Sequence, residues 1–242
     1  MKLYVIRHGQ TDYNAQRRFQ GQADIPLNEN GQDQARRAGS ILNSLLAQDC
    51  SKDNRTPVQI ITSDLLRTKQ TSQLILNELK EIRVRQSFDP RLREFHCGLL
   101  ENHTYEEFVL KHPELSTEYM NNFDIDSYNT RYPGLGGESR IDVMKRVGET
   151  LKETIHLIKQ QNDCVWVVHG GVIDVLLELM HIQIARPGND RISAGNGDVM
   201  VFIQSEKPRH FSDHSQKLGH SDGWQLDRHY KIGNAIAAKV VR

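Results

Sequence analysis

The chain has 242 residues, of which 37% are hydrophobic and 26% charged, enough apolar material for the core of one or two domains. Lys+Arg and Asp+Glu each number 31, so the formal net charge is zero and lacks the basic excess of a general nucleic-acid-binding protein. The three cysteines have no CxxC spacing, which indicates free thiols, and no apolar run reaches the roughly 20 residues of a membrane span. We therefore expect a cytoplasmic protein without nucleic-acid or membrane partners.

Short apolar runs alternate with longer helical patterns along the chain. Strands are predicted at residues 3–6, 58–62, 164–169, 198–203 and 224–229. Helices are predicted at residues 30–46, 65–80, 139–159 and 170–180. Asn30 is a plausible cap of the first helix, and Ser63 and Asp64 are good cap residues before the second. This alternation predicts an α/β fold, a three-layer sandwich in which helices flank a mainly parallel central sheet.

Residues 91–137 interrupt this alternation. The stretch is irregular, with possible short helices near 105–111 and 113–121, and it is too short and too polar to build a core of its own. We therefore predict one domain over residues 1–242, with a partly helical insertion at about 95–137.

Three of the predicted strands end in polar clusters, in the segments "YVIRHG", "QIITSDLLR" and "VWVVHGG". In an open α/β sheet, ligands bind at the carboxyl ends of the strands, so these clusters are expected to converge. Convergence would bring together Arg7, His8, Arg67 and His169, which make a strongly cationic pocket. A phosphoryl group is its natural ligand, because the planar guanidinium of arginine can hold two oxygens at once.

The longer motifs around these residues are similar to those of the histidine phosphatase superfamily, also called the phosphoglycerate mutase-like family. The similar segments are "RHGQTDYN", "FQGQADIPLNENGQDQA", "TSDLLRTKQT", "LREFHCGLLEN", "GGES" and "VVHGG". They follow the family's order from residue 7 to about residue 171, whereas the C-terminal strand matches only loosely. RHG alone is a weak pattern, but its combination with the later segments behind their strands is a strong one.

The resemblance implies a phosphoryl-transfer site that needs no metal or other cofactor. His8 matches the nucleophile that becomes a phosphohistidine, and Arg7 and Arg67 match two arginines that clamp the phosphoryl group. His169 matches a second histidine that donates a hydrogen bond to a phosphoryl oxygen. Glu94 matches the acid that protonates the leaving oxygen and then activates water. Attack on phosphorus needs an uncharged imidazole, and flanking arginines disfavour imidazolium while they stabilise charge on the oxygens.

Further positions match residues that line the phosphate pocket in the family. Asn14, six residues after His8, matches an asparagine near the phosphate, and Gln20 and Gly21 match a loop of the same pocket. Glycines that directly follow the histidines would let the backbone approach the ligand and donate N–H groups. These glycines are Gly9, Gly170 and Gly171.

Some residues near these motifs have competing or open roles. The acids that compete with Glu94 are Glu101, Glu106 and Glu107. His96 lies two residues after Glu94 and is given no role. The chain has Glu101-Asn102 where the family often has Glu-Gly, and "PGLGGES" carries two extra residues over the family's usual Pro-Gly-Gly-Glu-Ser. Both departures lie in the insertion that usually covers the pocket, so they bear on the choice of substrate.

The C-terminal part of the chain carries four more histidines, which are His210, His214, His220 and His229. Their spacing lacks the regularity of metal ligands, so we interpret residues 205–222 as a solvated loop and predict no metal site. Residues from about 205 to 242 are interpreted as a C-terminal extension.

The sequence favours a phosphatase that acts on a small phosphorylated metabolite. A mutase must retain a bisphosphorylated intermediate, which favours a long basic insertion, whereas this insertion contains many acids and few cations. A phosphoglycerate mutase-type phosphotransferase is one alternative. A non-catalytic protein that binds a phosphorylated ligand is another, although retention of the complete residue set argues against it. The substrate could be a sugar phosphate, a phosphorylated carboxylic acid, a nucleotide or a cofactor precursor, and the oligomeric state is left open.

Overall fold

The computed structural model describes residues 2–48, 57–134, 136–159, 163–182, 193–204 and 224–232. Its centre is a six-stranded sheet in the order β3-β2-β4-β1-β5-β6. The strands are β1 (Lys2–Arg7), β2 (Val58–Thr62), β3 (Val84–Phe88), β4 (Cys164–Val168), β5 (Val199–Gln204) and β6 (Trp224–Tyr230). The first four strands pair in parallel, while β5 runs antiparallel to both β1 and β6. The predicted mainly parallel α/β sheet is therefore confirmed.

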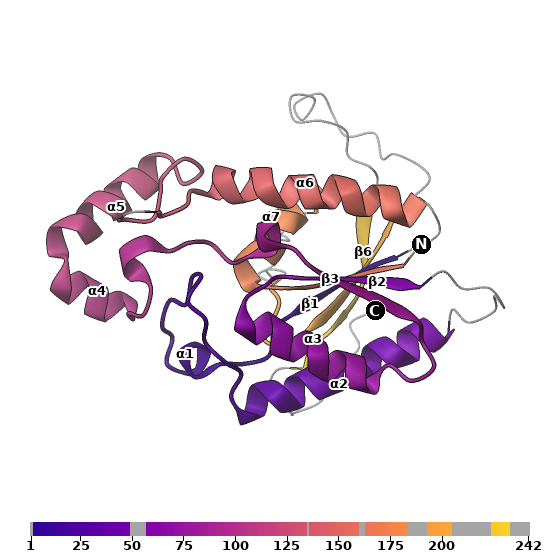
Figure 1. The fold of residues 1–242 in the computed structure, drawn as a ribbon. Coiled ribbons are helices and arrows are strands. Elements are labelled where there is room, and N and C mark those ends of the chain that lie inside the picture. The colour runs from indigo at the N-terminus through magenta and orange to yellow at the C-terminus, as the bar shows by residue number, and fades with distance from the viewer. Residues whose placement is uncertain are drawn as a thin grey trace, which may run out of the picture.

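Helices cover both faces of this sheet and make three layers (Figure 1). On one face lie α2 (Glu29–Gln48) and α3 (Leu66–Glu78), and on the other α6 (Arg140–Lys159) and α7 (Gly170–Leu179). Alternation along β1 sends Leu3 and Val5 into the α6–α7 core and Tyr4 and Ile6 into the α2–α3 core. A strand buried on both faces reads as a continuous apolar run, which explains the composition of β1 and β4.

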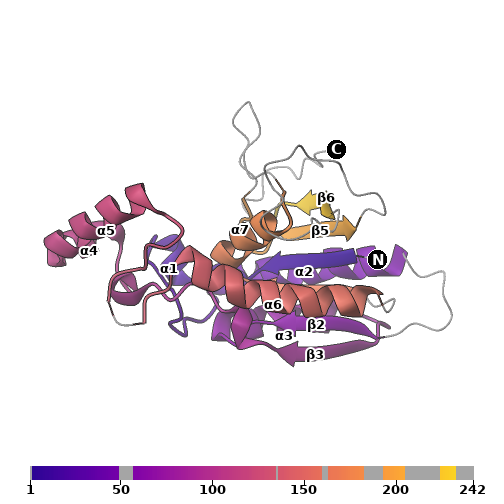
Figure 2. The same ribbon diagram turned by 90° about the horizontal axis from the view of Figure 1, so that it is seen from above.

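The insertion projects beyond the carboxyl ends of the parallel strands (Figure 2). It contains α4 (Tyr105–Lys111) and α5 (Pro113–Ile125), which confirm the two predicted short helices, although α5 continues four residues further. Three of its residues, Cys97, Leu100 and Phe108, form a small apolar cluster that also contacts Phe19 from the N-terminal part of the chain. This shared packing ties the insertion to the loop that follows β1.

Two predicted helix caps are wrong, because other residues satisfy the first N–H groups. Helix α2 begins at Glu29, and Asn28, not Asn30, accepts the N–H of Gly31 at 2.8 Å. Helix α3 has no side-chain cap of its own, and Asp24 from a distant loop accepts the N–H of Leu66 at 2.7 Å. Ser63 and Asp64 are thereby left for other contacts.

Some short elements had no sequence prediction. These are strand β3 and the helices α1 (Asp12–Ala15), η1 (Pro90–Leu92) and η2 (Gly98–Leu100). The predicted loop at 205–222 lies outside the described residues, and of the predicted C-terminal extension only 224–232 is described, where β6 joins the sheet. Among the helices of the described ranges, none has the length and apolar composition needed to cross a membrane.

Candidate active site

A cavity of about 840 Å³ lies between the carboxyl ends of the parallel strands and the insertion. Arg7 and His8 enter it from the end of β1, and Arg67 enters from the first turn of α3. His169 follows β4 directly and lies behind His8, with 5.2 Å between the two ring centroids. The structure therefore brings together the four basic residues that the strand ends predicted.

The His8 side chain is buried and held in one orientation. Its Nδ1 lies 2.7 Å from the carbonyl oxygen of Gly9, a contact that places the ring proton on Nδ1 and leaves the lone pair on Nε2. Burial, and then the charges of Arg67 and Arg7, lower the pKa of His8 well below its usual 6.5. The imidazole is therefore neutral at physiological pH, which is the form that a nucleophile requires.

His169 is fully buried, and its Nε2 lies 2.8 Å from the hydroxyl oxygen of Ser63. Its pKa also lies well below 6.5, because of burial first and then the charges of Arg67, His8, Arg146 and Arg7. In one of its two neutral tautomers the ring accepts the Ser63 hydroxyl proton at Nε2 and carries its own proton on Nδ1. Among the described residues His169 Nδ1 has no partner, so in this tautomer its N–H can donate to a ligand.

The two arginines are fixed by backbone carbonyls rather than by carboxylates. Arg67 donates to the carbonyls of Gly21 and Ala23 at 2.7 and 2.8 Å, and Arg7 donates to that of Ala194 at 2.6 Å. Burial lowers the pKa of Arg67 to about 10, so it keeps its charge at neutral pH. Burial also lowers the pKa of Arg7, against the charges of Glu94, Asp198 and Asp174.

Some of the unsatisfied polar atoms belong to the basic residues of the site. The buried side-chain atoms without a partner in the described structure include Nε of Arg7, Nε of Arg67 and Nδ1 of His169. A buried donor without a partner costs about 1–3 kcal/mol, and natural structures contain few of them. Arg7 and Arg67 line the cavity and His169 adjoins His8, so an anionic ligand bound there would supply acceptors for such donors.

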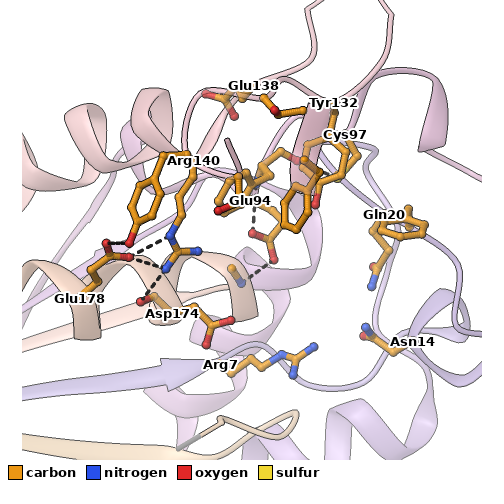
Figure 3. A pocket seen from close by; sticks show the side chains of 18 of the residues that line it. Arg7, Asn14, Gln20, Glu94, Cys97, Tyr132, Glu138, Arg140, Asp174 and Glu178 are labelled. Carbon is orange, nitrogen blue, oxygen red and sulfur yellow. Dashed lines mark hydrogen bonds and ion pairs between the residues drawn. The ribbon is translucent and has the colours of Figure 1, made fainter. Parts of the chain in front are cut away.

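The polar loop after β1 supplies the remaining predicted pocket residues. Asn14 Oδ1 accepts from the backbone N–H of Thr11 at 3.1 Å, and its amide nitrogen is turned toward Arg7 (Figure 3). Gln20 is buried, with its Oε1 2.9 Å from the Thr11 hydroxyl. Gly21 has a φ of +51°, and a Cβ there would collide with the Glu101 side chain. All three predicted residues, Asn14, Gln20 and Gly21, line the cavity.

Among the candidate acids, Glu94 is the one that lines the cavity. Its carboxylate accepts the backbone N–H of Phe95 at 3.0 Å and that of Gly171, at the start of α7, at 3.1 Å (Figure 3). Glu101 instead accepts backbone N–H groups of Gln22 and Cys97, each at 3.0 Å. It therefore braces two loops.

The other two acidic competitors lie on α4, away from the cavity. Glu107 caps that helix and pairs with Arg18. Glu106 is exposed on the same helix. His96 accepts the backbone N–H of Gly98 at 3.1 Å, which gives it a role in the turn rather than in the pocket.

The predicted role of Gly9 needs correction, whereas that of Gly170 stays a prediction. Gly9 faces α2, where a Cβ would lie 2.1 Å from the Gly31 carbonyl oxygen, so it allows close packing instead of ligand approach. A Cβ on Gly170 would lie 3.2 Å from the Arg7 guanidinium carbon, so Gly170 leaves room for that side chain. Gly171 is the glycine of this pair that lines the cavity.

Sequence reasoning missed the residues that support the pocket from behind. The sequence pattern indicates only a helix cap at Ser63. Asp198 accepts from His229 at 2.9 Å and from the backbone of Gly195 and Ile232, each at 2.7 Å. Burial alone would raise the pKa of Asp198, but these hydrogen bonds lower it. Asp198 thereby holds the loop whose Ala194 carbonyl receives Arg7.

Asn196 belongs to the same supporting loop. Its side-chain nitrogen donates to the His8 carbonyl at 3.1 Å and to Asn14 Oδ1 at 3.2 Å. No isolated motif marks these residues in the sequence. Within the described ranges, no group of three or more His, Cys, Asp or Glu side chains lies close enough together to hold a metal ion.

Comparison with known proteins agrees with this geometry. The family model of the histidine phosphatase superfamily (branch 1) matches residues 3–214. A probable phosphoglycerate mutase, GpmB of Serratia proteamaculans, is 33% identical over 177 residues, which are 73% of each chain.

Solved structures also resemble the chain. The mycobacterial glucosyl-3-phosphoglycerate phosphatase in complex with VO3 superposes with a TM-score of 0.64 and 28% identity, covering 93% of this chain and 96% of the other. A putative alpha-ribazole-5'-P phosphatase from Escherichia coli has a TM-score of 0.66 over 93% of this chain and 94% of its own. At 19% identity, this second likeness concerns the fold alone.

Proposed function

This chain belongs to the histidine phosphatase superfamily, and from that premise we propose that it is a metal-independent phosphomonoesterase that works through a phosphohistidine on His8. The substrate is a small phosphorylated metabolite. The observation that carries the proposal is the state of His8, a buried neutral imidazole with its proton held on Nδ1 between two arginines.

In the first step, His8 Nε2 attacks the phosphorus atom of the ester. The bond between phosphorus and the ester oxygen breaks, and Glu94 donates a proton to that oxygen so that a neutral alcohol leaves. Arg7, Arg67 and the Nδ1–H of His169 contact the non-bridging oxygens, where negative charge concentrates. The phosphoryl oxygens thereby accept hydrogen bonds from the donors that have no partner in the ligand-free pocket.

In the second step, water takes the place of the alcohol. Glu94, now a carboxylate, accepts a proton from this water, and the hydroxide oxygen bonds to phosphorus as the His8 nitrogen leaves. Inorganic phosphate is released, and Glu94 and His8 return to their starting protonation states. The arginines supply the positive field that Mg²⁺ provides in many other phosphoryl-transfer enzymes.

The charge distribution of the cavity supports a phosphatase over a mutase. The other two arginines that line it are committed to carboxylates, Arg18 to Glu107 and Arg140 to Glu178 at 2.7 Å. Among the described residues, the cations that remain for an anion, Arg7 and Arg67, suffice for one phosphoryl group. A bisphosphorylated intermediate would meet further carboxylates there, which disfavours its retention.

A phosphoglycerate mutase is the second candidate, and the similarity to the probable phosphoglycerate mutase of Serratia proteamaculans supports it. The two activities differ in the acceptor of the phosphoryl group. A mutase returns it to the three-carbon acid, whereas a phosphatase gives it to water.

The deciding experiment measures both outcomes in one reaction. Purified protein is incubated with 3-phosphoglycerate, with and without 2,3-bisphosphoglycerate, and separately with p-nitrophenyl phosphate. Phosphate release from p-nitrophenyl phosphate, without conversion to 2-phosphoglycerate, is expected, and His8→Ala should abolish it. Interconversion of the phosphoglycerates that exceeds phosphate release would replace the proposal with the mutase.

A further inference from the structure

Six aromatic side chains line part of the cavity. The lining aromatic residues are Phe19, Phe95, Tyr119, Phe123, Tyr128 and Tyr132. Tyr132 stacks on Tyr119 with a centroid separation of 5.5 Å and meets the rings of Phe95 and Phe19 edge-on at 6.1 and 6.5 Å. Tyr119, Phe123 and Tyr132, which all come from the insertion or its end, define what we call the aromatic wall.

Part of this wall is exposed in the described structure. Phe123 is 41% exposed at the carboxyl-terminal end of α5, and its ring centroid lies 5.9 Å from that of Tyr119. Tyr128 also lines the cavity, is 44% exposed and donates to Glu178 at 2.6 Å. Exposed aromatic surface inside a concave site is the usual signature of a ligand subsite.

Carboxylates from α7 face this region. Asp174 and Glu178 line the same cavity, and Figure 3 draws them on the side that carries Arg140, below Glu94. The Asp174 charge acts on Arg7, and Glu178 is paired with Arg140. Glu178 is compensated by Arg140, and Asp174 adds negative charge near Arg7, so among the described residues this side of the cavity offers a second negative charge of the leaving group no cation that is not already paired with a carboxylate.

From the aromatic wall and the carboxylates of α7 we infer that the substrate is a phosphate monoester of an alcohol that carries a planar ring and no anionic group. The inference rests on the proposed function, because the phosphoryl group must sit against Arg7, His8 and Arg67 for the alcohol part to reach the aromatic wall. The ring then stacks on Tyr119 and Phe123, on the side of the cavity away from His8. Stacking depends little on the substituents of the substrate's ring. The aromatic wall therefore indicates a class of substrates and not one compound.

The test compares esters whose alcohols have similar acidity, so that leaving-group chemistry does not enter. The set contains 2-phenylethyl phosphate, propyl phosphate, 2-(4-carboxyphenyl)ethyl phosphate and glucose 6-phosphate. We expect kcat/KM for the phenylethyl ester to exceed that for the propyl ester by about 10- to 100-fold, the range that one stacked ring provides. The added carboxylate should remove most of this advantage.

Two variants assign the preference to the wall. The double variant Tyr119→Leu/Phe123→Ala should bring the ratio of the two kcat/KM values close to one. Phe88→Ala is the matched control, because Phe88 is an aromatic residue that is 51% exposed on β3 and outside the cavity. It should leave the ratio as in the wild type.

The outcomes separate the two proposals. Equal turnover of the phenylethyl and propyl esters, a ratio unchanged in the double variant, or a preference for the sugar phosphate or the carboxylated ester would overturn the ring inference while the phosphatase stands. Absence of turnover for every ester and for p-nitrophenyl phosphate would overturn the phosphatase. In that case, calorimetric Kd values of His8→Ala for the phenylethyl and propyl esters decide the ligand class, and equal values would refute it.

Discussion

The hydroxyl of Ser63 lies 2.8 Å from Nε2 of His169, and both side chains are completely buried. Ser63 follows β2 and His169 follows β4, two strands that pair in parallel. In the tautomer that the proposed mechanism requires, Nε2 accepts the Ser63 hydroxyl proton and Nδ1 carries the proton that is donated toward the phosphoryl group. Several testable consequences of the site begin from such supporting contacts.

Replacement of Ser63 should disturb His169 without removing it. In Ser63→Ala, both ring tautomers of His169 become accessible, and kcat/KM is expected to fall about 10-fold, the effect of one buried hydrogen bond. The 15N chemical shifts of the His169 ring should move from one defined tautomer toward a mixture, a change that a purely structural role would not cause. Ser72→Ala, which also removes a buried hydroxyl from the α2–α3 side of the sheet, should leave those shifts unchanged.

The stability of the protein should decrease on acidification below about pH 6.5. His8 and His169 have folded-state pKa values well below 6.5, so the unfolded chain binds more protons in the interval from 6.5 down to those values. Each histidine then removes up to about 1.4 kcal/mol of unfolding free energy per pH unit. Urea titrations at pH 7.5 and 5.5 measure this loss, and His8→Gln should make it smaller. A wild type equally stable at both pH values would contradict the buried neutral assignment.

Substitution of Glu94 should affect substrates according to their leaving group. In Glu94→Gln, kcat/KM for alkyl phosphates should fall by roughly 10²- to 10⁴-fold, because an alkoxide needs a proton to leave. A nitrophenolate is stable as an anion, so p-nitrophenyl phosphate should lose far less. The comparison uses kcat/KM, which reports the first irreversible step and so excludes the hydrolysis of the phosphohistidine.

The acidic neighbour Glu101 is the matched control for that measurement. Glu101→Gln removes a carboxylate that holds two backbone N–H groups, so it should lower stability without discriminating between leaving groups. Equal losses for both substrates in Glu94→Gln would refute its role as the acid.

Activity should persist after chelation. Arg7, Arg67 and His169 provide the positive charge and the donors for the phosphoryl oxygens, so no step of the proposed mechanism passes through a metal ion. Rates on p-nitrophenyl phosphate, measured before and after dialysis against EDTA, should agree. A rate that vanishes in EDTA and returns with one divalent cation would show that the mechanism is wrong.

Asp198 should act on phosphate binding through Arg7. The Asp198 carboxylate accepts three hydrogen bonds. In Asp198→Asn the side-chain NH2 group faces one of these N–H donors, so that hydrogen bond is lost, which should cost about 1–3 kcal/mol of unfolding free energy. The loop that receives Arg7 loosens, so the inhibition constant of inorganic phosphate should rise. His229→Gln keeps a donor near Asp198 and should have the smaller effect on both quantities. An unchanged phosphate inhibition constant in Asp198→Asn would remove the link to Arg7.

The sequence predicted the elements whose pattern is set by burial alone. Strands β1 and β4 are apolar on both faces, so their ends, and with them Arg7, His8 and His169, could be placed before the structure was known. Strand β3 could not, because it is an edge strand with mostly exposed residues and the polar sequence "VRQSF". Its place in the sheet depends on pairing with β2, which no local pattern indicates.

The supporting residues of the site were missed for a similar reason. In the sequence, Ser63 has the residue type and position of a helix cap. In the structure Asp24 caps α3 instead, and the Ser63 hydroxyl contacts His169. Tyr119 lies inside the helix predicted at 113–121 and Phe123 lies beyond its predicted end, and neither carries a functional signal in the sequence. Their orientation into the cavity depends on how the insertion folds back over the strand ends, and local periodicity carries no information about that.

The place of β1 in the sheet has a consequence for protein synthesis. Its partners β4 and β5 begin at Cys164 and Val199. The first strand to be synthesised therefore pairs with strands that are synthesised late. At about 5–20 residues per second, the ribosome takes on the order of ten seconds or more to reach them. During that interval the apolar strand that leads to Arg7 and His8 has neither of its native neighbours in the sheet. Stalling translation before Val199 should therefore yield nascent chains that remain sensitive to protease and bind no phosphate.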